Sequence, residues 1–351
     1  MRNRAYMTFL LSLVMAALSL SCTKIDRIYD SGNVEIALSA RSSLMTRTTE
    51  DYPKEKVFGV YAYTTTLDGG TAWKPALADS DLYLENVRFK SYHDGENVVA
   101  KGDGKSYYWP LSGSMLFYGY SPHIEESEDC IKSVSHSPNV QSPTDANAYF
   151  AIDFQQKDDP AKMQELMWFD AKDVEGGVSL TKNDDVTVTF RRAHAKVTVN
   201  IEYEYYKKVS LRLTECISRG IFYSGATPGW MPDASKDADG NYEYLESYML
   251  FNEERQGDKD KYEGTVSMFM MPQYTDGFFD EVGVQIGGDM MLEFTIKDGD
   301  LGNETVVSVP LKNYTEKWEM GRHYIYNISV MPKRIEYGEP IIEIRTDKIA
   351  I

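Results

Sequence analysis

Apolar and polar residues alternate with a period of two through much of this chain, and this pattern constrains the fold more than any other feature. It is clearest in residues 186–190, Val-Thr-Val-Thr-Phe, and resumes from Val197 to Tyr205. After an apolar N-terminal segment, no long stretch has the 3.6-residue periodicity of an amphipathic helix. Because successive side chains of a strand point to opposite faces, the sequence predicts an all-β protein.

The two halves of this alternation are out of phase. Apolar residues occupy even positions before Arg191 and odd positions after Lys196. A shift of one residue turns every side chain to the opposite face of a sheet, so either a bulge lies near His194 or the chain leaves one sheet and enters another. We favour the second interpretation and predict a domain boundary between residues 194 and 195.

Shorter apolar runs predict the remaining strands. They are 34–38, 57–63, 83–89, 107–110 and 115–120 in the first half, and 264–271, 282–286, 291–296, 305–311 and 324–330 in the second. The final segment, from Ile341 to Ile351, is apolar to the end of the chain. Since termini are usually polar and frayed, this tail is expected to pair with another strand.

The N-terminal segment has the features of a lipoprotein export signal. Two arginines precede an apolar block, residues 7–20, which is shorter than the roughly 18 residues of a membrane-spanning helix. Small Ser21 stands directly before Cys22, where a lipoprotein peptidase would cleave. We therefore predict that residues 1–21 are a signal peptide and that Cys22 is acylated, with palmitate among the candidate chains. An ordinary signal peptide beside an incidental cysteine is the alternative.

The length and charge of the chain limit the number of domains and the classes of partner that it can have. The chain has 351 residues, enough for two domains of ordinary size, and a formal net charge of −17. Such an acidic chain is repelled by nucleic acid, so we expect no nucleic-acid partner. Cys130 and Cys216 are expected to be free buried thiols, a disulfide between them being the alternative, and no cysteine spacing indicates zinc.

Residue patterns typical of catalysis or metal binding are weak throughout. The five histidines are scattered, and His194 is interpreted as structural. Residues 233–241 place oxygen ligands at alternate positions, but Ala238 and Tyr244 stand where a calcium loop needs Gly and Glu. We therefore predict no enzyme, no catalytic residue, no metal site and no cofactor.

Several motifs together resemble the fimbrillins, lipoprotein pilins of Bacteroidota that build type V pili. In addition to Cys22, they are Thr46-Arg47-Thr48, Phe58-Gly59-Val60-Tyr61, Tyr108-Trp109-Pro110, Leu116 to Pro122, Glu165 to Asp170, Val186 to Val199, Met271-Pro272-Gln273 and Gly321 to Tyr326. The resemblance implies two transthyretin-like β-sandwich domains in tandem, residues 22–194 and 195–351. It also implies an acylated precursor at the outer membrane, and assembly by strand exchange after a trypsin-like protease cuts behind an arginine.

These implications identify candidate residues. Val34, Ile36 and Leu38 would share one face of a first strand, and the polar stretch after it contains Arg47, the candidate cleavage site, with Arg41 as its competitor. Cleavage would excise residues 22–47 and open a sheet edge. Within residues 339–351, the candidate donor side chains are Ile342, Ile344, Ile349 and Ile351.

The predicted function is that of a structural or adhesive subunit of a cell-surface fimbrium, a pilus that serves in cell adhesion. Expected partners are other pilin subunits, the outer membrane through lipid on Cys22, a trypsin-like processing protease, and a host or bacterial surface receptor. The alternative is a surface glycan-binding lipoprotein of a polysaccharide-uptake system, in which Trp73 or Trp230 would stack on sugar rings.

Overall fold

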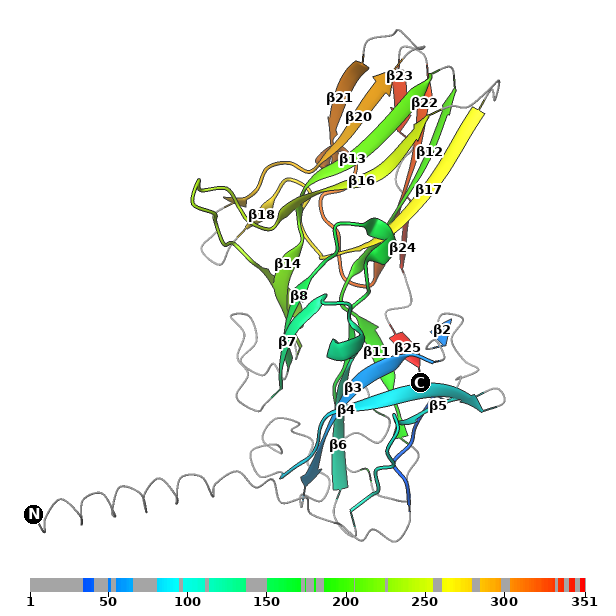
Figure 1. Ribbon diagram of the computed structural model, residues 1–351, viewed down its shortest axis with the longest axis vertical. Helices are drawn as coiled ribbons and strands as arrows, with labels where there is room; N and C mark the ends of the chain where they lie inside the picture. Colours follow the sequence, from blue (N-terminus) through cyan, green and yellow to red (C-terminus); the bar gives the residue numbers. More distant parts are fainter. Residues whose placement is uncertain are drawn as a thin grey trace, which may run out of the picture.

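The computed structural model describes residues 34–40, 50–51, 55–65, 81–94, 97–110, 114–136, 150–171, 174, 180, 186–204, 206–224, 227–254, 261–279, 285–297, 304–331, 334–337, 341–344 and 348–350. Strands make up most of these residues, and the helical elements among them are short 3₁₀ turns at Ile124–Glu126, Pro160–Lys162 and Leu311–Asn313. The prediction of an all-β protein is confirmed. Figure 1 shows the strands in two groups along the long axis, which we call the first and the second sandwich.

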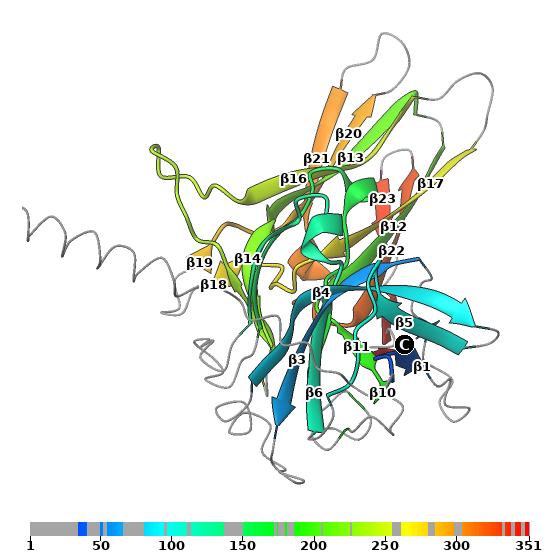
Figure 2. The ribbon, with the colours of Figure 1, turned by 60° about the horizontal axis from the view of Figure 1, so that its bottom comes forward.

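One large sheet dominates the first sandwich. Its order is β10 (Val186–Thr187), β1 (Leu38–Ala40), β5 (Asn97–Gly102), β4 (Asp81–Asp94), β3 (Val57–Thr65), β6 (Ser114–Ser121), β9 (Met167–Phe169), β11 (Thr189–Arg192), β25 (Lys348–Ala350) and β2 (Glu50–Asp51). Only Val188 separates β10 from β11 along the chain. The path across the sheet from β10 therefore returns to the same stretch of chain at β11, and the sheet curls into a barrel (Figure 2).

The inside of this barrel holds the first core. Phe58 of β3 and Phe190 of β11 are fully buried there. Their rings meet edge to face at 5.3 Å between centroids, although β3 and β11 are not neighbours in the sheet. Phe169 contacts Phe190 in the same way at 5.0 Å. The contact between Phe58 and Phe190 crosses the barrel interior, whereas Phe169 and Phe190 belong to the neighbouring strands β9 and β11.

The other face of the same strands packs on a second sheet. That sheet has the order β15 (Gly229–Pro232), β14 (Arg219–Tyr223), β8 (Phe150–Gln155) and β7 (Ile131–His136). Tyr61 of β3 and Tyr118 of β6 lie in one buried cluster with Phe150 and Phe154 of β8. Because β3 and β6 are buried on both faces, their sequences are nearly continuous apolar runs instead of strict alternations.

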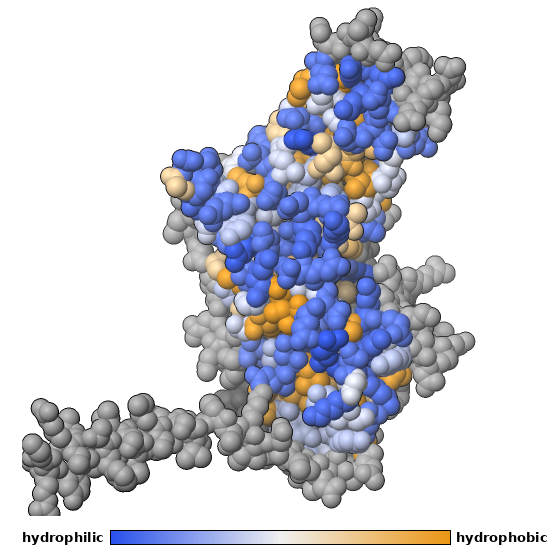
Figure 3. All heavy atoms as spheres, in the orientation of Figure 1, coloured by the Kyte–Doolittle hydropathy of each residue, from blue (hydrophilic) through white to orange (hydrophobic). Residues whose placement is uncertain are grey.

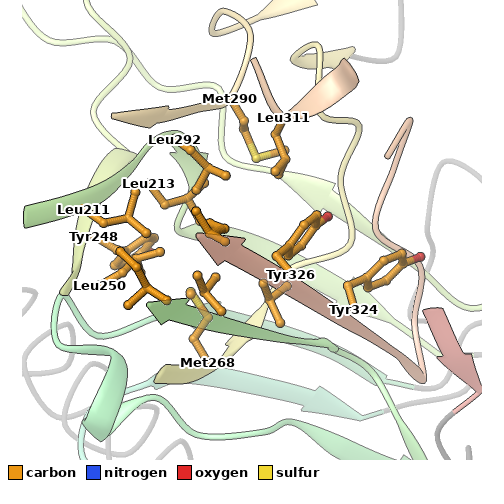
Figure 4. Packing of buried hydrophobic residues seen from close by; sticks show 14 of the residues in the cluster. Leu211, Leu213, Tyr248, Leu250, Met268, Met290, Leu292, Leu311, Tyr324 and Tyr326 are labelled. Carbon is orange, nitrogen blue, oxygen red and sulfur yellow. The ribbon is translucent and has the colours of Figure 1, made fainter. Parts of the chain in front are cut away.

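The second sandwich has a simpler two-layer construction. One sheet has the order β17 (Lys261–Met270), β12 (Ala195–Glu204), β22 (Arg322–Met331) and β23 (Arg334–Tyr337), with β24 (Ile341–Ile344) also on β22. The other has the order β16 (Leu245–Glu254), β13 (Lys208–Ile217), β20 (Met291–Lys297) and β21 (Glu304–Pro310). Leucine, methionine and tyrosine side chains from both sheets meet in one core (Figure 4). A short ribbon of β18 (Phe278–Phe279) and β19 (Gln285–Ile286) completes the described strands.

The change of phase near His194 coincides with a change of sheet. β11 belongs to the curled sheet and β12 to the second sandwich, so the favoured interpretation is confirmed. Hydrogen bonding nevertheless crosses this point, because β14 pairs with β8 and places Phe222 opposite Ile152. The division of the chain into domains 22–194 and 195–351 therefore stays a prediction.

Most predicted strands overlap observed ones, but 34–38 overlaps β1 at Leu38 alone and 107–110 contributes only an isolated bridge at Tyr108. Several observed strands were not predicted. The missed strands include β5, β7, β8, β13, β14 and β16. Strand β13 carried a usable signal, since Val209, Leu211 and Leu213 alternate with polar residues. In the described part of the chain, no helix has the length and apolar content needed to span a membrane.

Candidate assembly site

The first described strand lies inside the curled sheet. β1 pairs antiparallel with β5, where Leu38 faces Ala100, and parallel with β10, where Leu38 faces Val186. Ile36 and Leu38 are fully buried, whereas Val34 is 38% exposed. Two of the three side chains predicted to share one face therefore lie in the barrel core, and the strand is an integral part of that core.

Backbone hydrogen bonds extend the attachment beyond β1. The Ile36 N–H donates to the Tyr107 carbonyl at 2.7 Å, and the Trp109 N–H donates to the Val34 carbonyl at 3.0 Å. Residues 107–109 were predicted as a strand, and the structure pairs them with residues 34–36. The N-terminal segment thus has partners on both of its edges, as a central strand does.

An ion pair anchors the same segment at its surface. The Lys101 ammonium lies 2.7 Å from the Glu35 carboxylate. The hydrogen bond from Lys101 lowers the pKa of Glu35, so this carboxyl stays ionised. Lys101 belongs to β5, a strand that the sequence analysis missed, although Val98, Val99 and Ala100 form a short apolar run before it.

The C-terminal tail connects the two sandwiches. β23 and then β24 run antiparallel along β22, on consecutive stretches of that strand. β25 then pairs antiparallel with β11 and parallel with β2 in the curled sheet. Figure 1 shows β23 near one end of the molecule and β25 beside β11 toward the other. One tail thus adds strands to both sandwiches.

The structure places some of the predicted site residues. Ile342 and Ile344 belong to β24, where Ile342 faces Tyr324 and Ile344 faces Arg322 of β22. Ile349 belongs to β25 and faces Phe190 of β11. Cys22, Arg41, Arg47, Trp73 and Ile351 lie outside the described residues. The roles of all these residues stay predictions.

Comparison with known proteins decides the family. The sequence matches the family described as fimbrillin-like over residues 46–343. The chain belongs to this fimbrillin-like family. The resemblance drawn from the motifs is therefore confirmed.

Solved structures with a similar arrangement come from Bacteroides and Porphyromonas species. A candidate cell adhesion protein from Bacteroides uniformis is 14% identical at a TM-score of 0.49, covering 88% of this chain and 98% of that chain. A fimbrial protein from Bacteroides vulgatus is 13% identical at a TM-score of 0.42, covering 82% and 92%. The tip fimbrial protein of Porphyromonas gingivalis, truncated at its C-terminus, is 11% identical at a TM-score of 0.36, covering 88% and 99%. A search of curated proteins finds no match.

Two glycines among the motifs of this fimbrillin-like protein make room for aromatic rings. A Cβ atom at Gly59 would overlap the ring of Tyr120, and one at Gly119 would overlap the ring of Phe169. Both rings belong to buried clusters of the first sandwich. These glycines therefore allow the close packing of strands that carry large aromatic side chains.

The residues where the chain changes sheet have structural roles. The buried His194 ring accepts the Leu166 N–H through Nδ1 at 2.8 Å, and the His194 carbonyl accepts the Gly321 N–H at 3.0 Å. Trp230 donates its Nε1–H to the Ala193 carbonyl at 2.6 Å and packs near His194 with 5.0 Å between ring centroids. His194 thus ties the two sandwiches together. Trp230 is half-buried at the same junction, where these contacts give its ring a structural role.

Buried polar groups of the fimbrillin-like fold are also structural. The Arg192 guanidinium pairs with the Glu165 carboxylate, and their side chains are 3% and 10% exposed. Cys130 and Cys216 are free and buried, and burial raises the pKa of both thiols. The expectation of free thiols is confirmed, and such cysteines are unreactive.

The acidic loop that resembled a calcium site is held by its own hydrogen bonds. The Asp237 carboxylate accepts the N–H groups of Asp239 and Asn241, each at 2.9 Å, which lowers the pKa of Asp237. Among the described residues, no group of three or more histidines, cysteines and acidic residues is arranged to hold a metal ion. The interactions found around the candidate residues are hydrogen bonds, strand pairing and packing.

Proposed function

We propose that this fimbrillin-like protein is a structural subunit of a cell-surface fimbrium, exported as a lipoprotein and assembled by strand exchange. Its family supports the role of a fimbrial subunit that has no enzymatic activity. The finer proposal rests on one observation, the central position of β1 between β5 and β10. Cleavage after Arg47 would remove residues 22–47, and with them β1, and would leave its place in the sheet open.

Removal of β1 should cost a large part of the free energy that stabilises the first sandwich. Ile36 and Leu38 are fully buried, and burying an aliphatic side chain contributes about 1.5–3 kcal/mol. Their loss removes about 3–6 kcal/mol, against roughly 5–15 kcal/mol for the stability of a whole domain. The edges of β5 and β10 also lose their hydrogen-bond partners. A cleaved subunit is therefore driven to accept a replacement strand.

We propose that the C-terminal tail of another subunit supplies this strand. Ile349 and Ile351 are two residues apart, as are Ile36 and Leu38, so both pairs present side chains on one face of a strand. Within its own chain, β25 already pairs with β11 of the curled sheet. That pairing supports the compatibility of the tail with this sheet.

The cleavage step is tested with two arginine variants. Wild type, Arg47→Ala and Arg41→Ala are expressed in a host that exports and processes them, and surface material is run on a gel without boiling. We expect ladders of polymer from wild type and Arg41→Ala and none from Arg47→Ala. Equal ladders from wild type and Arg47→Ala would overturn cleavage at Arg47.

The donor strand is tested with neighbouring substitutions. Ile349→Asn places a polar side chain on the face proposed to enter the open site, whereas Lys348→Asn changes the opposite face. We expect the ladder to disappear for Ile349→Asn and to persist for Lys348→Asn. Loss of the ladder in both variants, or in neither, contradicts the proposed role of Ile349.

Mass spectrometry of the mature N-terminus tests the lipid anchor. A chain that begins at Thr48 supports a polymerising subunit, and a chain that begins at acylated Cys22 supports a subunit that stays anchored in the outer membrane. Cys22→Ala should remove the precursor from the membrane fraction. Retention of this variant in that fraction contradicts anchoring through Cys22.

A further inference from the structure

Strand β21 is the outermost strand of its sheet in the second sandwich (Figure 1). It pairs with β20 over residues 304–310 without a register shift. Among the described strands, none pairs with its other edge. The outward row of backbone N–H and carbonyl groups along β21 is therefore open to a further strand.

Between its terminal residues Glu304 and Pro310, β21 has none of the charges, prolines or bulges that protect edge strands. No charged side chain occurs from Thr305 to Pro310. Val307 packs against the core, so Val306 points away from it, and it is 58% exposed, more than any other large hydrophobic side chain described. The face seen in Figure 3 is largely hydrophilic, with hydrophobic residues in separate small areas. An exposed apolar edge strand of this kind is a template for strand pairing.

Other long edge strands of the second sandwich differ from β21. The pairing of β16 with β13 contains two register shifts, and β16 ends in Glu253 and Glu254. On β17, the Phe269 carbonyl accepts a hydrogen bond from the Gln156 side chain. Irregular pairing, terminal charge and a bonded carbonyl each discourage addition of a strand. The edge of β21 is regular, and its one charged residue is Glu304 at the start of the strand.

We propose that β21 pairs with β21 of a second copy of this chain, antiparallel and about a two-fold axis. Two copies with a net charge of −17 repel each other, so contact is favoured where charge is absent. Full overlap about Val307 places Val306 opposite Ser308, and Glu304 opposite Pro310 of the other copy. No two acidic side chains of β21 then face each other, and the same patch serves both copies.

This contact is separate from the proposed strand exchange. It uses the second sandwich, whereas β1 lies in the first. Stable interfaces bury about 1,200–2,000 Å², and one short strand pair buries less, so isolated copies should associate weakly. If the proposed fimbrium forms, repeated copies would add these contacts along neighbouring fibres and join them side by side.

Sedimentation velocity over a range of concentrations tests the contact. The full chain carries Arg47→Ala, which blocks the proposed cleavage, and Cys22→Ala, which removes the lipid. On this background, Val306→Lys is compared with Ser135→Lys, which adds the same charge at an exposed position of edge strand β7. We expect Val306→Lys to raise the dissociation constant of the dimer at least tenfold and Ser135→Lys to leave it unchanged. Equal association of Val306→Lys and its parent, or a monomeric parent, overturns the proposal.

Cross-linking identifies the partner strand. Val306→Cys and Ser308→Cys proteins, each with Cys22→Ala, are mixed and oxidised with copper phenanthroline, which accepts the two electrons released as two thiols form a disulfide. Cys130 and Cys216 are buried and should not react. We expect covalent dimers mainly in the mixture, because residues 306 and 308 face each other across the proposed axis. Association without this cross-link would show that another segment is the partner and would overturn the pairing of β21 with β21.

Discussion

The two sandwiches are assembled from the chain in different ways. The core of the second comes almost entirely from residues 195–330, with Met163 added. The curled sheet of the first takes β1 from the N-terminal side and β25 from the tail, while its second sheet takes β14 and β15 from beyond residue 195. The first sandwich, which is assembled from remote segments, can lose or gain one of these segments while the second sandwich, built almost entirely from one continuous stretch, stays intact. This difference is compatible with the strand exchange that we propose.

The largest expected loss of stability comes from a cavity in one of the two cores. Phe190→Ala opens a cavity in the barrel and should cost about 3–5 kcal/mol, and Phe294→Ala should do the same in the second sandwich, since both side chains are fully buried. Hydrogen exchange should show lost protection in β3 and β6 for the first variant and in β12 and β22 for the second. Loss across both sandwiches in both variants would mean that they unfold as one unit.

The next effect compares a buried with an exposed ion pair. Glu165→Gln leaves the buried Arg192 without its carboxylate, and replacing a hydrogen bond to a charged group costs about 1.5–3 kcal/mol. Asp289→Asn removes the partner of Lys312 in the second sandwich, where the side chains are 33% and 45% exposed, and should cost at most about 1 kcal/mol. Denaturant unfolding measures both, and equal losses would contradict the comparison.

Acid should weaken the first sandwich more than the second. Burial lowers the pKa of His136 in β7 to about 3, far below the value near 6.5 of an unfolded chain. The unfolded state therefore binds a proton that the folded state excludes, so stability is full above about pH 6.5 and falls as the pH drops below it. From pH 7 to pH 5 the loss from this group is about 2 kcal/mol.

His136→Gln supplies the control for this pH dependence. The glutamine side chain does not titrate in this range. The substitution also changes the hydrogen bond of 2.9 Å between His136 and the Tyr63 hydroxyl. We therefore expect a lower stability at pH 7 but a shallower fall between pH 7 and pH 5, measured by urea unfolding. An unchanged slope would show that other groups cause the acid sensitivity.

The smallest effect concerns the outer face of the second sandwich. Asn200 of β12 donates to Asn327 of β22 at 2.8 Å and accepts from Thr265 of β17 at 2.9 Å, forming a polar row across three strands. Because Asn327 is exposed, Asn327→Ala should cost only about 0.5–1 kcal/mol. Thermal unfolding measures this loss, and a cost as large as that of Phe294→Ala would mean that this row carries more stability than its exposure suggests.

Local patterns predicted strands well where one face of a strand is buried. The alternations at 186–190 and 197–204 lie in β10 to β12, and their phase change marks the passage from one sheet to another. Strand β7 was missed because it is short and contains few apolar residues, and β5 because its apolar run is only three residues long. For such strands the neighbouring strand supplies most of the stability, and a local pattern does not reveal it.

The candidate assembly site was predictable in part. Ile36 and Leu38 were expected on one face, and both are buried. Their partners, residues 107–109, β5 and β10, are far away in the sequence. The pairing of β14 with β8 across the predicted boundary and the ion pair of Arg192 with Glu165 were likewise not foreseen. Each joins residues whose proximity depends on the path of the whole chain.

By itself, the sequence determined that this protein is all-β and that its motifs resemble those of a fimbrillin, and it favoured a change of sheet near His194 over a bulge. These conclusions depend on local periodicity and short motifs, which are properties of neighbouring residues. Only the tertiary structure decided that β1 is a central strand of a curled sheet and that β25 joins that sheet from the far end of the chain. Strand order follows from long-range hydrogen bonding and burial, in which residues far apart in the sequence become partners only when the chain is folded.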